Sequence, residues 1–260
     1  MVQYRISFIG AGKVSKALMR ALYNSGHIIR EIMSRSGINS RILSEMYNAI
    51  PKEDYTFSGE ADIIIVAIPD DELAGVLGEI ECSENVIVVH TAGSLGLEIF
   101  PPSLNHQGVF YPLQTFSDDR AIDLKNVPFF IEASDQYTAG VLTNLAGSIG
   151  GKVRFITTGT RKLLHVAAVF VSNFTNYMLT SGNRIMIEAG LDFEYLEPLV
   201  KETIFKALEK GPEDSQTGPA VRLDMGTIER HTSLLSFSPE LQSLYTHITQ
   251  SIINYYNTRK

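Results

Sequence analysis

Short apolar runs alternate with helix-forming stretches over the first half of the chain. The apolar runs, which predict strands, cover residues 4–9, 27–33, 62–68 and 85–90. The stretches that predict helices cover residues 13–24, 40–49 and 71–78. Continuous apolar runs are typical of strands buried on both faces, as in parallel sheets. The alternation therefore predicts an α/β fold with a doubly wound, mostly parallel sheet.

The pattern changes after His90 and again near residue 155. Residues 108–111, 127–131 and 152–156 predict further strands, and residues 136–149 predict a helix. From Arg161 onward long helices are expected over residues 161–189, 193–210 and 239–256. Pro219 suits the first turn of another helix. We therefore expect an α/β domain over residues 1–155 and an all-helical domain over residues 156–260.

A glycine-rich turn, G-A-G-K-V-S at residues 10–15, stands where the first predicted strand meets the first predicted helix. Gly10 permits a tight turn, and Gly12 lets the backbone approach a pyrophosphate. The N–H groups and positive dipole end of the helix then favour an anion. Ser15 departs from the usual pattern by replacing its third glycine. The turn predicts a Rossmann-like dinucleotide site with Gly10, Gly12, Lys13 and Val14; the alternative is a turn that only reverses the chain.

The end of the second predicted strand indicates which dinucleotide binds. An NAD site has Asp or Glu about 20 residues after the glycines, on the ribose 2′-hydroxyl. Here residues 33–36 read M-S-R-S, and Glu31 is expected inside the strand. Arg35, flanked by Ser34 and Ser36, offers a guanidinium and two hydroxyl donors, which suit a 2′-phosphate. We therefore predict NADP rather than NAD; a solvated arginine on a surface loop is the other interpretation.

Two segments directly follow buried strands and belong to one predicted edge of the sheet. In open α/β sheets, ligands bind outside the carboxyl ends of the strands. The residues expected to bind the cofactor there are Ile68, Pro69, Thr91 and Ala92. His90 and Ser94 are expected to bind substrate, and a packed histidine at a strand end explains His90 equally well.

The first long helix carries polar side chains on an apolar background. At about 100° per residue, five of them fall on one face: Lys162, His165, Ser172, Asn173 and Asn176. Buried polar groups need partners, and small-molecule sites favour clefts between domains. We expect a pocket with His165 or Lys162 as proton donor and with Asn173 or Asn176 holding a substrate oxygen. The catalytic candidates are thus His165, Lys162 and Asn173, with Ser172 and Asn176 binding substrate; a hydrogen-bond network between helices is the alternative.

A second polar cluster lies further along the chain, with Thr217, Arg222, Asp224, Thr227, Arg230 and His231. The last three share one helix face. The cluster either completes the substrate pocket across a dimer, with Thr217 binding substrate, or forms a solvated face, which is favoured for Arg230. His165 and His231 do not have metal-motif spacing and no cysteine cluster exists, so we predict no metal.

Composition restricts the partners and the compartment. The chain has 22 Lys and Arg against 29 Asp and Glu, a formal net charge of −7, and an acidic chain is a poor nucleic-acid binder. Cys82 is the one cysteine, which excludes a disulfide framework. The apolar runs are shorter than the roughly 20 residues that span a membrane, and no signal-peptide pattern is present. We expect a cytoplasmic protein that binds neither nucleic acid nor membrane.

Five motifs carry a resemblance to a known family. They are G-A-G-K-V-S at 10–15, H-T-A-G-S-L-G at 90–96, Y-P-L-Q-T-F at 111–116, H-V-A-A-V-F-V-S-N at 165–173 and T-G-P-A-V-R at 217–222. The chain resembles oxidoreductases that join a Rossmann-like NADP-binding domain to a helical domain of unknown function. More distantly, it looks like pyrroline-5-carboxylate reductase, the 6-phosphogluconate and β-hydroxyacid dehydrogenases, and NADP oxidoreductases that use a deazaflavin.

The resemblance implies NADP on the glycine turn and on the Ser-Arg-Ser loop, a substrate pocket between the domains, and a homodimer through the helical domain. One family feature is missing. The β-hydroxyacid dehydrogenases have a lysine and an asparagine four residues apart on the first helix of the second domain. In this chain the residue four positions after Lys162 is Val166. That catalytic pair therefore does not carry over.

The combined prediction is an NADP-dependent oxidoreductase. It would move hydride between nicotinamide and a small-molecule C=O or C=N substrate near His90, His165 and Asn173. A non-catalytic NADP(H)-binding sensor or interaction protein is the main alternative. A structural α/β protein that binds no nucleotide is the third interpretation.

Overall fold

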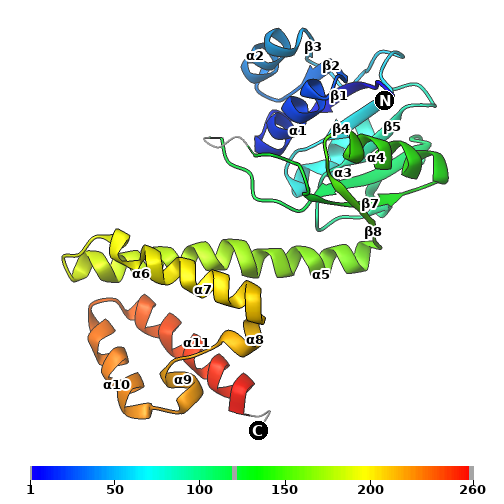
Figure 1. Ribbon diagram of the computed structural model, residues 1–260. Helices are drawn as coiled ribbons and strands as arrows, with labels where there is room; N and C mark the ends of the chain where they lie inside the picture. The colour runs from blue at the N-terminus through cyan, green and yellow to red at the C-terminus, as the bar shows by residue number, and fades with distance from the viewer. Residues whose placement is uncertain (1, 119–121, 258–260) are drawn as a thin grey trace. The chain divides into compact units, whose positions relative to one another are not determined.

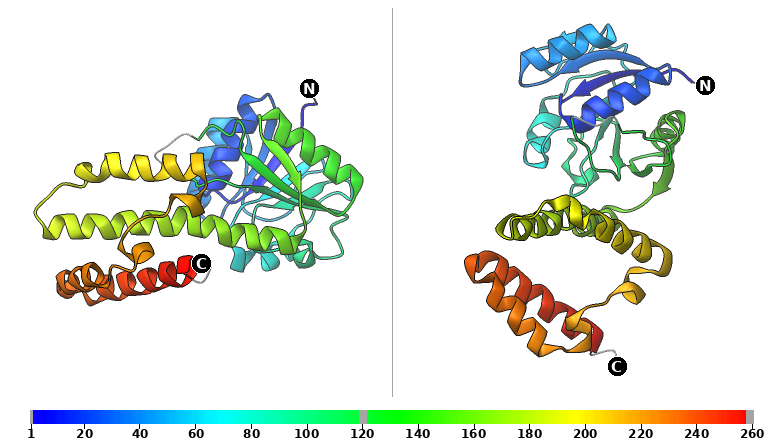
Figure 2. Two further views of the ribbon diagram at one scale, coloured as in Figure 1. Left: turned by 60° about the horizontal axis from the view of Figure 1, so that its bottom comes forward. Right: turned by 60° about the vertical axis from the view of Figure 1, so that its left-hand side comes forward.

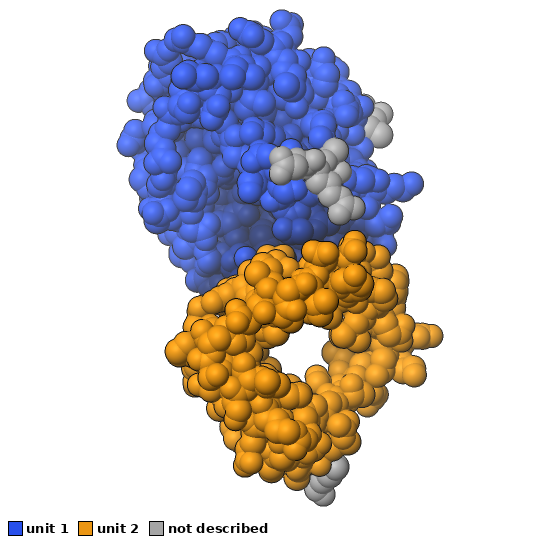
Figure 3. All heavy atoms as spheres, turned by 90° about the vertical axis from the view of Figure 1, so that its left-hand side faces the viewer, with its two compact units in different colours: residues 1–173 blue, residues 174–260 orange. Residues whose placement is uncertain are grey.

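The computed structural model describes residues 2–118 and 122–257, which fall into two compact units (Figure 1). Unit 1 is Met1–Asn173 and unit 2 is Phe174–Lys260; they are blue and orange in Figure 3. An α/β unit followed by a helical unit agrees with the predicted fold classes. The predicted division at residue 155 stays a prediction.

One eight-stranded sheet forms the centre of unit 1, in the order β3-β2-β1-β4-β5-β6-β7-β8. The strands are β1 (Arg5–Ile9), β2 (Ile28–Met33), β3 (Ile50–Lys52), β4 (Ile63–Val66), β5 (Ile87–His90), β6 (His106–Pro112), β7 (Pro128–Ala133) and β8 (Lys152–Phe155). Neighbouring strands are parallel except β6 and β7, which are antiparallel. The mostly parallel sheet predicted from the apolar runs is confirmed.

Helices cover both faces of this sheet (Figures 1 and 2). They are α1 (Lys13–Asn24), α2 (Gly37–Tyr47), α3 (Asp70–Glu79) and α4 (Gln136–Ser148). One apolar cluster joins α1, α2 and α4 to the sheet through side chains such as Leu18, Leu43 and Leu142. A second cluster packs Leu73 and Leu77 of α3 on the opposite face. Every residue of β4 and β5 is buried, which explains their continuous apolar sequences.

The strand order reverses between β1 and β4, and this switch point positions the site. The chain winds outward through β2 and β3 on one side and through β5 and β6 on the other. Ile9 pairs with Val66 at the carboxyl ends of β1 and β4. In doubly wound sheets, ligands bind in the crevice at this point.

A long helical stretch follows β8, and a π-helical segment interrupts it. The helix α5 (Thr158–Ala168) begins at a Thr157 cap, whose hydroxyl oxygen accepts the Thr160 N–H. The segment η2 (Val169–Phe174) is π-helical, and α6 (Thr175–Glu188) follows in unit 2. One regular helix was predicted over residues 161–189, and this is wrong in detail. Hydrogen bonds from i to i+5 give η2 more residues per turn, so the angles expected beyond Ala168 do not apply.

Unit 2 is helical throughout its regular elements. Its helices after α6 are α7 (Glu197–Lys210), α8 (Pro212–Ser215), α9 (Pro219–Arg222), α10 (Met225–Leu234) and α11 (Pro239–Asn257), with short 3₁₀ turns η3 (Phe193–Leu196) and η4 (Leu235–Phe237). Ala220, Ile228, Leu235 and Leu241 are its buried apolar residues in the described part of the chain. Figure 3 shows an opening within unit 2.

Within residues 2–118 and 122–257, no helix is both long enough and apolar enough to cross a membrane. The same ranges contain no group of three His, Cys, Asp or Glu side chains that is arranged to hold a metal ion.

Candidate functional site

The glycine turn has the backbone geometry that a dinucleotide site requires. Gly10 has φ +109°, and a methyl group there would lie 2.2 Å from the Ala67 carbonyl oxygen, so only glycine fits. Gly12 is different, because nothing lies within 4 Å of the position its methyl group would take. It caps α1 without a side-chain hydrogen bond, and the first turn has no acidic residue. The open space beside Gly12, at the N-terminus of α1, therefore suits a pyrophosphate.

Ser15, the departure from the glycine pattern, fits at the helix–strand contact. Its side chain is fully buried, and its hydroxyl donates to the Ala67 carbonyl oxygen at 3.4 Å. A small hydroxyl residue therefore packs α1 against the end of β4 and finds a hydrogen-bond partner there. The replaced glycine does not disturb the turn.

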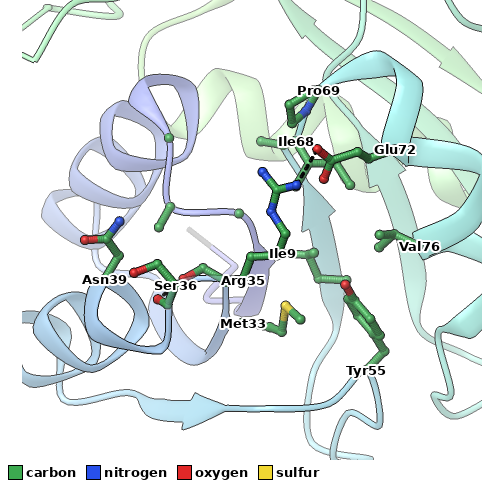
Figure 4. A pocket seen from close by; sticks show the side chains of 15 residues that line it. Ile9, Met33, Arg35, Ser36, Asn39, Tyr55, Ile68, Pro69, Glu72 and Val76 are labelled. Carbon is green, nitrogen blue, oxygen red and sulfur yellow. Dashed lines mark hydrogen bonds and ion pairs between the residues drawn. The ribbon is translucent and has the colours of Figure 1, made fainter.

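A cavity of about 350 Å³ opens at the switch point (Figure 4). Seven of the predicted cofactor residues line it, namely Gly10, Gly12, Ser34, Arg35, Ser36, Ile68 and Pro69. The wall also includes residues that no motif indicated, among them Met33, Asn39, Tyr55, Glu72 and Val76. A cradle of N–H groups beside a guanidinium fits a phosphorylated dinucleotide.

Arg35 reaches across this cavity to a carboxylate. Its Nη1 lies 2.7 Å from Glu72 Oε1, and its side chain is 76% exposed. The Ser34 hydroxyl donates to the Ser36 carbonyl oxygen at 2.6 Å and so shapes the loop. Glu31 is buried inside β2, where it accepts the Ser7 hydroxyl and the Ser58 N–H. The acidic side chain in this cavity therefore comes from α3 and not from β2.

The remaining predicted cofactor residues lie elsewhere in unit 1. Lys13 and Val14 line a second cavity. Thr91 and Ala92 follow β5, where the Thr91 N–H donates to the Val66 carbonyl oxygen. The Ala92 N–H donates to His90 Nδ1, which holds the start of the loop against the end of the strand.

The second cavity measures about 630 Å³ and holds three of the predicted substrate-site residues. His165, Ser172 and Asn173 line it together with Tyr111 and a largely apolar wall that includes Phe116. His165 belongs to α5, and Ser172 and Asn173 belong to η2. The structure thus places these three side chains around one cavity despite the change of helical geometry between them.

Tyr111 is a candidate functional residue that the sequence patterns did not reveal. Its hydroxyl lies 3.0 Å from His165 Nδ1. A methyl group on Gly93 would lie 2.6 Å from His165 Nδ1 and 3.0 Å from Tyr111 Cζ, so three segments converge here. Burial and the Asp70 carboxylate raise the pKa of Tyr111, with Arg161 opposing them. The available signal was the position of Tyr111 at the start of the Y-P-L-Q-T-F motif.

The other predicted substrate-site residues have different surroundings. Lys162 Nζ lies 3.4 Å from Glu98 Oε1, and neither lines the second cavity. Asn176 belongs to α6 in unit 2. Thr217 lines an apolar cavity of about 320 Å³ in unit 2. Roles for these residues stay predictions.

His90 and Ser94 are held by neighbouring groups. His90 is fully buried and stacks on Phe100; burial lowers its pKa to about 4. The Ser94 hydroxyl donates to the Asp70 carboxylate. Of the two interpretations of His90, the packed histidine is the one that its contacts favour.

A buried ion pair anchors the loop after β5. Arg161 is fully buried, and its Nη1 lies 2.6 Å from Glu132 Oε2. Its Nη2 donates to the Leu95 carbonyl oxygen at 2.5 Å. The side chain thus ties the start of α5 to β7 and to the 90–96 loop, which fixes the position of His165 relative to Gly93.

Two family descriptions match the chain. Residues 2–115 match the Rossmann-like domain, and residues 127–252 match the Domain of unknown function (DUF2520). A search of curated proteins found no match.

Solved structures match over nearly all of the chain. A Bacteroides fragilis protein with the provisional name NADP oxidoreductase is 36% identical, with a TM-score of 0.87, over 97% of this chain and 98% of its own. A Myxococcus stipitatus imine reductase in complex with NADP⁺ is 14% identical, with a TM-score of 0.67, over 98% and 93%. A Streptococcus pyogenes 1-pyrroline-5-carboxylate reductase is 13% identical, with a TM-score of 0.61, over 97% and 99%. The last two share the fold.

Proposed function

Since the chain belongs to the family that joins a Rossmann-like domain to the domain of unknown function DUF2520, we propose that it is an NADP-dependent oxidoreductase. Its reaction would be hydride transfer between nicotinamide and a small C=O or C=N substrate. The observation that carries the proposal is the presence of two cavities in unit 1. One is lined by the glycine turn and Arg35, and the other by Tyr111 and His165.

The chain's own groups divide the work. Gly10, Gly12 and the first turn of α1 would hold the pyrophosphate, and Arg35 would hold the 2′-phosphate. When bound, NADP(H) supplies or accepts a hydride. Tyr111 keeps its phenolic proton at neutral pH and can donate it to a substrate oxygen or nitrogen, with His165 Nδ1 3.0 Å behind it as the relay.

The second cavity supports a particular kind of substrate. Its wall is largely apolar, and its polar groups come from a few side chains, including Tyr111, Gln114, Ser172 and Asn173. Such a lining suits a small molecule with one polar reacting group. The imine reductase and pyrroline-5-carboxylate reductase of like fold support a C=N group as the first choice.

Binding and turnover test the proposal separately. Calorimetry with NADPH and NADH tests the cofactor site, and Arg35→Ala should weaken NADPH binding about tenfold or more while sparing NADH. Arg41→Ala removes an equally charged, exposed side chain that pairs with Glu53 outside the cavity, and is the matched control. Equal losses for both cofactors in Arg35→Ala would contradict the 2′-phosphate role.

A panel of small imines, ketones and aldehydes, followed by nicotinamide absorbance, tests the chemistry. Turnover of at least one class is expected. Tight NADPH binding without turnover would favour the non-catalytic sensor instead, and absence of binding would remove both. The cytoplasmic location and the homodimer stay predictions.

A further inference from the structure

The cavity at the switch point, here called the dinucleotide cavity, has one carboxylate among its described lining residues, that of Glu72. Glu72 already binds the guanidinium of Arg35. Glu72 comes from the first turn of α3, after β4, and Arg35 comes from the loop after β2. Their side chains meet across the switch point (Figure 4). The Glu72 side chain is 30% exposed, whereas that of Arg35 is 76% exposed. The carboxylate is therefore the more fixed partner of the pair.

The pair uses only part of the guanidinium. The contact is a single Nη1–Oε1 bond of 2.7 Å, although a guanidinium has five N–H donors. A 2′-phosphate that binds Arg35 must share the guanidinium with Glu72 or displace it. Because phosphate and carboxylate are both anions, their proximity opposes NADP binding. A ribose 2′-hydroxyl has the opposite preference, since a carboxylate is its usual acceptor.

We propose that Glu72 sets the cofactor preference of this site, by competing with the 2′-phosphate for Arg35 and by accepting the 2′-hydroxyl of NAD. This inference rests on the proposed function. Arg35 makes NADP binding possible, and Glu72 limits the margin by which NADP is preferred. The site therefore accepts both cofactors with a smaller difference in affinity than Arg35 alone would give.

Asp71 provides a matched control on the same turn of α3. Its side chain is exposed, and it is not among the residues that line the cavity. Asp71→Asn and Glu72→Gln each remove one negative charge from the first turn of α3. A difference between the two variants therefore reports the position of Glu72 and not the net charge of the helix end.

Calorimetry on the full chain tests the inference with NADP⁺, NAD⁺ and the fragments adenosine 2′,5′-bisphosphate and 5′-AMP. We expect Glu72→Gln to bind NADP⁺ and the bisphosphate about fivefold more tightly, and NAD⁺ and 5′-AMP equally or less tightly. Asp71→Asn should change each affinity less than twofold. Unchanged thermal melting would show that both variants fold. If Glu72→Gln does not fold, Glu72→Ala is used in its place.

Two results would overturn the inference while leaving the proposed function intact. Weaker NADP⁺ binding by Glu72→Gln would make Glu72 a group that orients Arg35 for the phosphate. An equal change for both cofactors would remove any role in discrimination. Failure of the unmodified protein to bind either dinucleotide would instead overturn the proposed function and the inference together.

Discussion

Tyr111 and His165 form the hydrogen-bonded pair on which proton transfer is proposed. Tyr111→Phe removes the hydroxyl and keeps the ring that contacts Gly93. We expect turnover to fall about 100-fold or more, as is typical when a general acid is lost, with NADPH affinity unchanged. Steady-state kinetics and calorimetry check this. Tyr137→Phe, at an exposed tyrosine outside the second cavity, is the matched control. Full activity in Tyr111→Phe would remove Tyr111 from the chemistry.

His90 makes stability depend on acidity. Burial lowers its pKa from 6.5 to about 4; Arg161 lowers it further, whereas Asp70, Glu98 and the Gly96 carbonyl oppose the shift. Between these pH values the unfolded chain binds more protons than the folded chain. The part of the free energy of unfolding that depends on a neutral His90 is therefore fully present above pH 6.5. It is lost as the pH falls toward 4, and the loss is at most about 3 kcal/mol.

Denaturant unfolding at several pH values measures this loss. His90→Asn should reduce the slope between pH 6.5 and 4, since it removes one buried histidine and leaves His27, whose pKa burial also lowers. His247→Asn, at an exposed histidine of α11, is the control for the substitution itself. If the His90→Asn slope equals that of the unmodified protein, His90 does not carry the acid sensitivity.

The sequence could indicate single candidate residues better than their partners. Arg35 is recognisable from the Ser-Arg-Ser loop around it, and His165 from the stripe of polar side chains on one face of its predicted helix. Glu72 stands 37 residues from Arg35 and Tyr111 stands 54 residues from His165. Only the strand order brings such residues together, so a pattern of neighbouring residues does not reveal them. The stripe also included Lys162, which Glu98 holds outside the second cavity.

The two glycines of the turn before α1, Gly10 and Gly12, have different expected roles, which experiment can distinguish. Gly10→Ala places a methyl group against Ala67 at positive φ and should destabilise unit 1 by about 2 kcal/mol or more. Gly12→Ala meets open space at φ −78°, so the fold should keep its stability. Its methyl group would stand where the pyrophosphate approaches, and NADPH affinity should fall about tenfold or more. Thermal melting and calorimetry on both variants test these two expectations. Undiminished NADPH binding by Gly12→Ala would contradict a pyrophosphate site at Gly12.

Elements with a strong pattern were predicted well, and elements set by tertiary contacts were not. The helix over residues 13–24 coincides with α1, because Leu18, Met19 and Leu22 recur at helical spacing and pack into the apolar cluster on the sheet. β3 has three residues, of which two are exposed, so it has no apolar run to detect. The π-helical turn in η2 has no recognised sequence signal, since an apolar helix and its π-helical interruption share the same composition.

Unit 2 has a different balance of apolar surface from unit 1. Ile204, Phe205 and Leu208 of α7 are 45%, 68% and 79% exposed. A large exposed apolar surface is typical of an interface, and few apolar side chains in the described part of unit 2 are buried. Sequence patterning predicted the helices, but an apolar helix face has the same pattern whether it packs within the chain or against a partner. A second copy of the chain is the occupant that we expect, in line with the predicted homodimer.

Self-association can be tested through α7. Phe205→Glu combined with Leu208→Glu puts two charges on this apolar face, and burying them on association would cost several kcal/mol. We therefore expect sedimentation velocity to show a dimer for the unmodified protein and a monomer for the double variant, with the helical circular dichroism unchanged. Glu202→Lys changes an exposed charge on the same helix and should preserve the dimer. A monomeric unmodified protein at micromolar concentration would contradict the homodimer, and a dimeric double variant would place the interface away from α7.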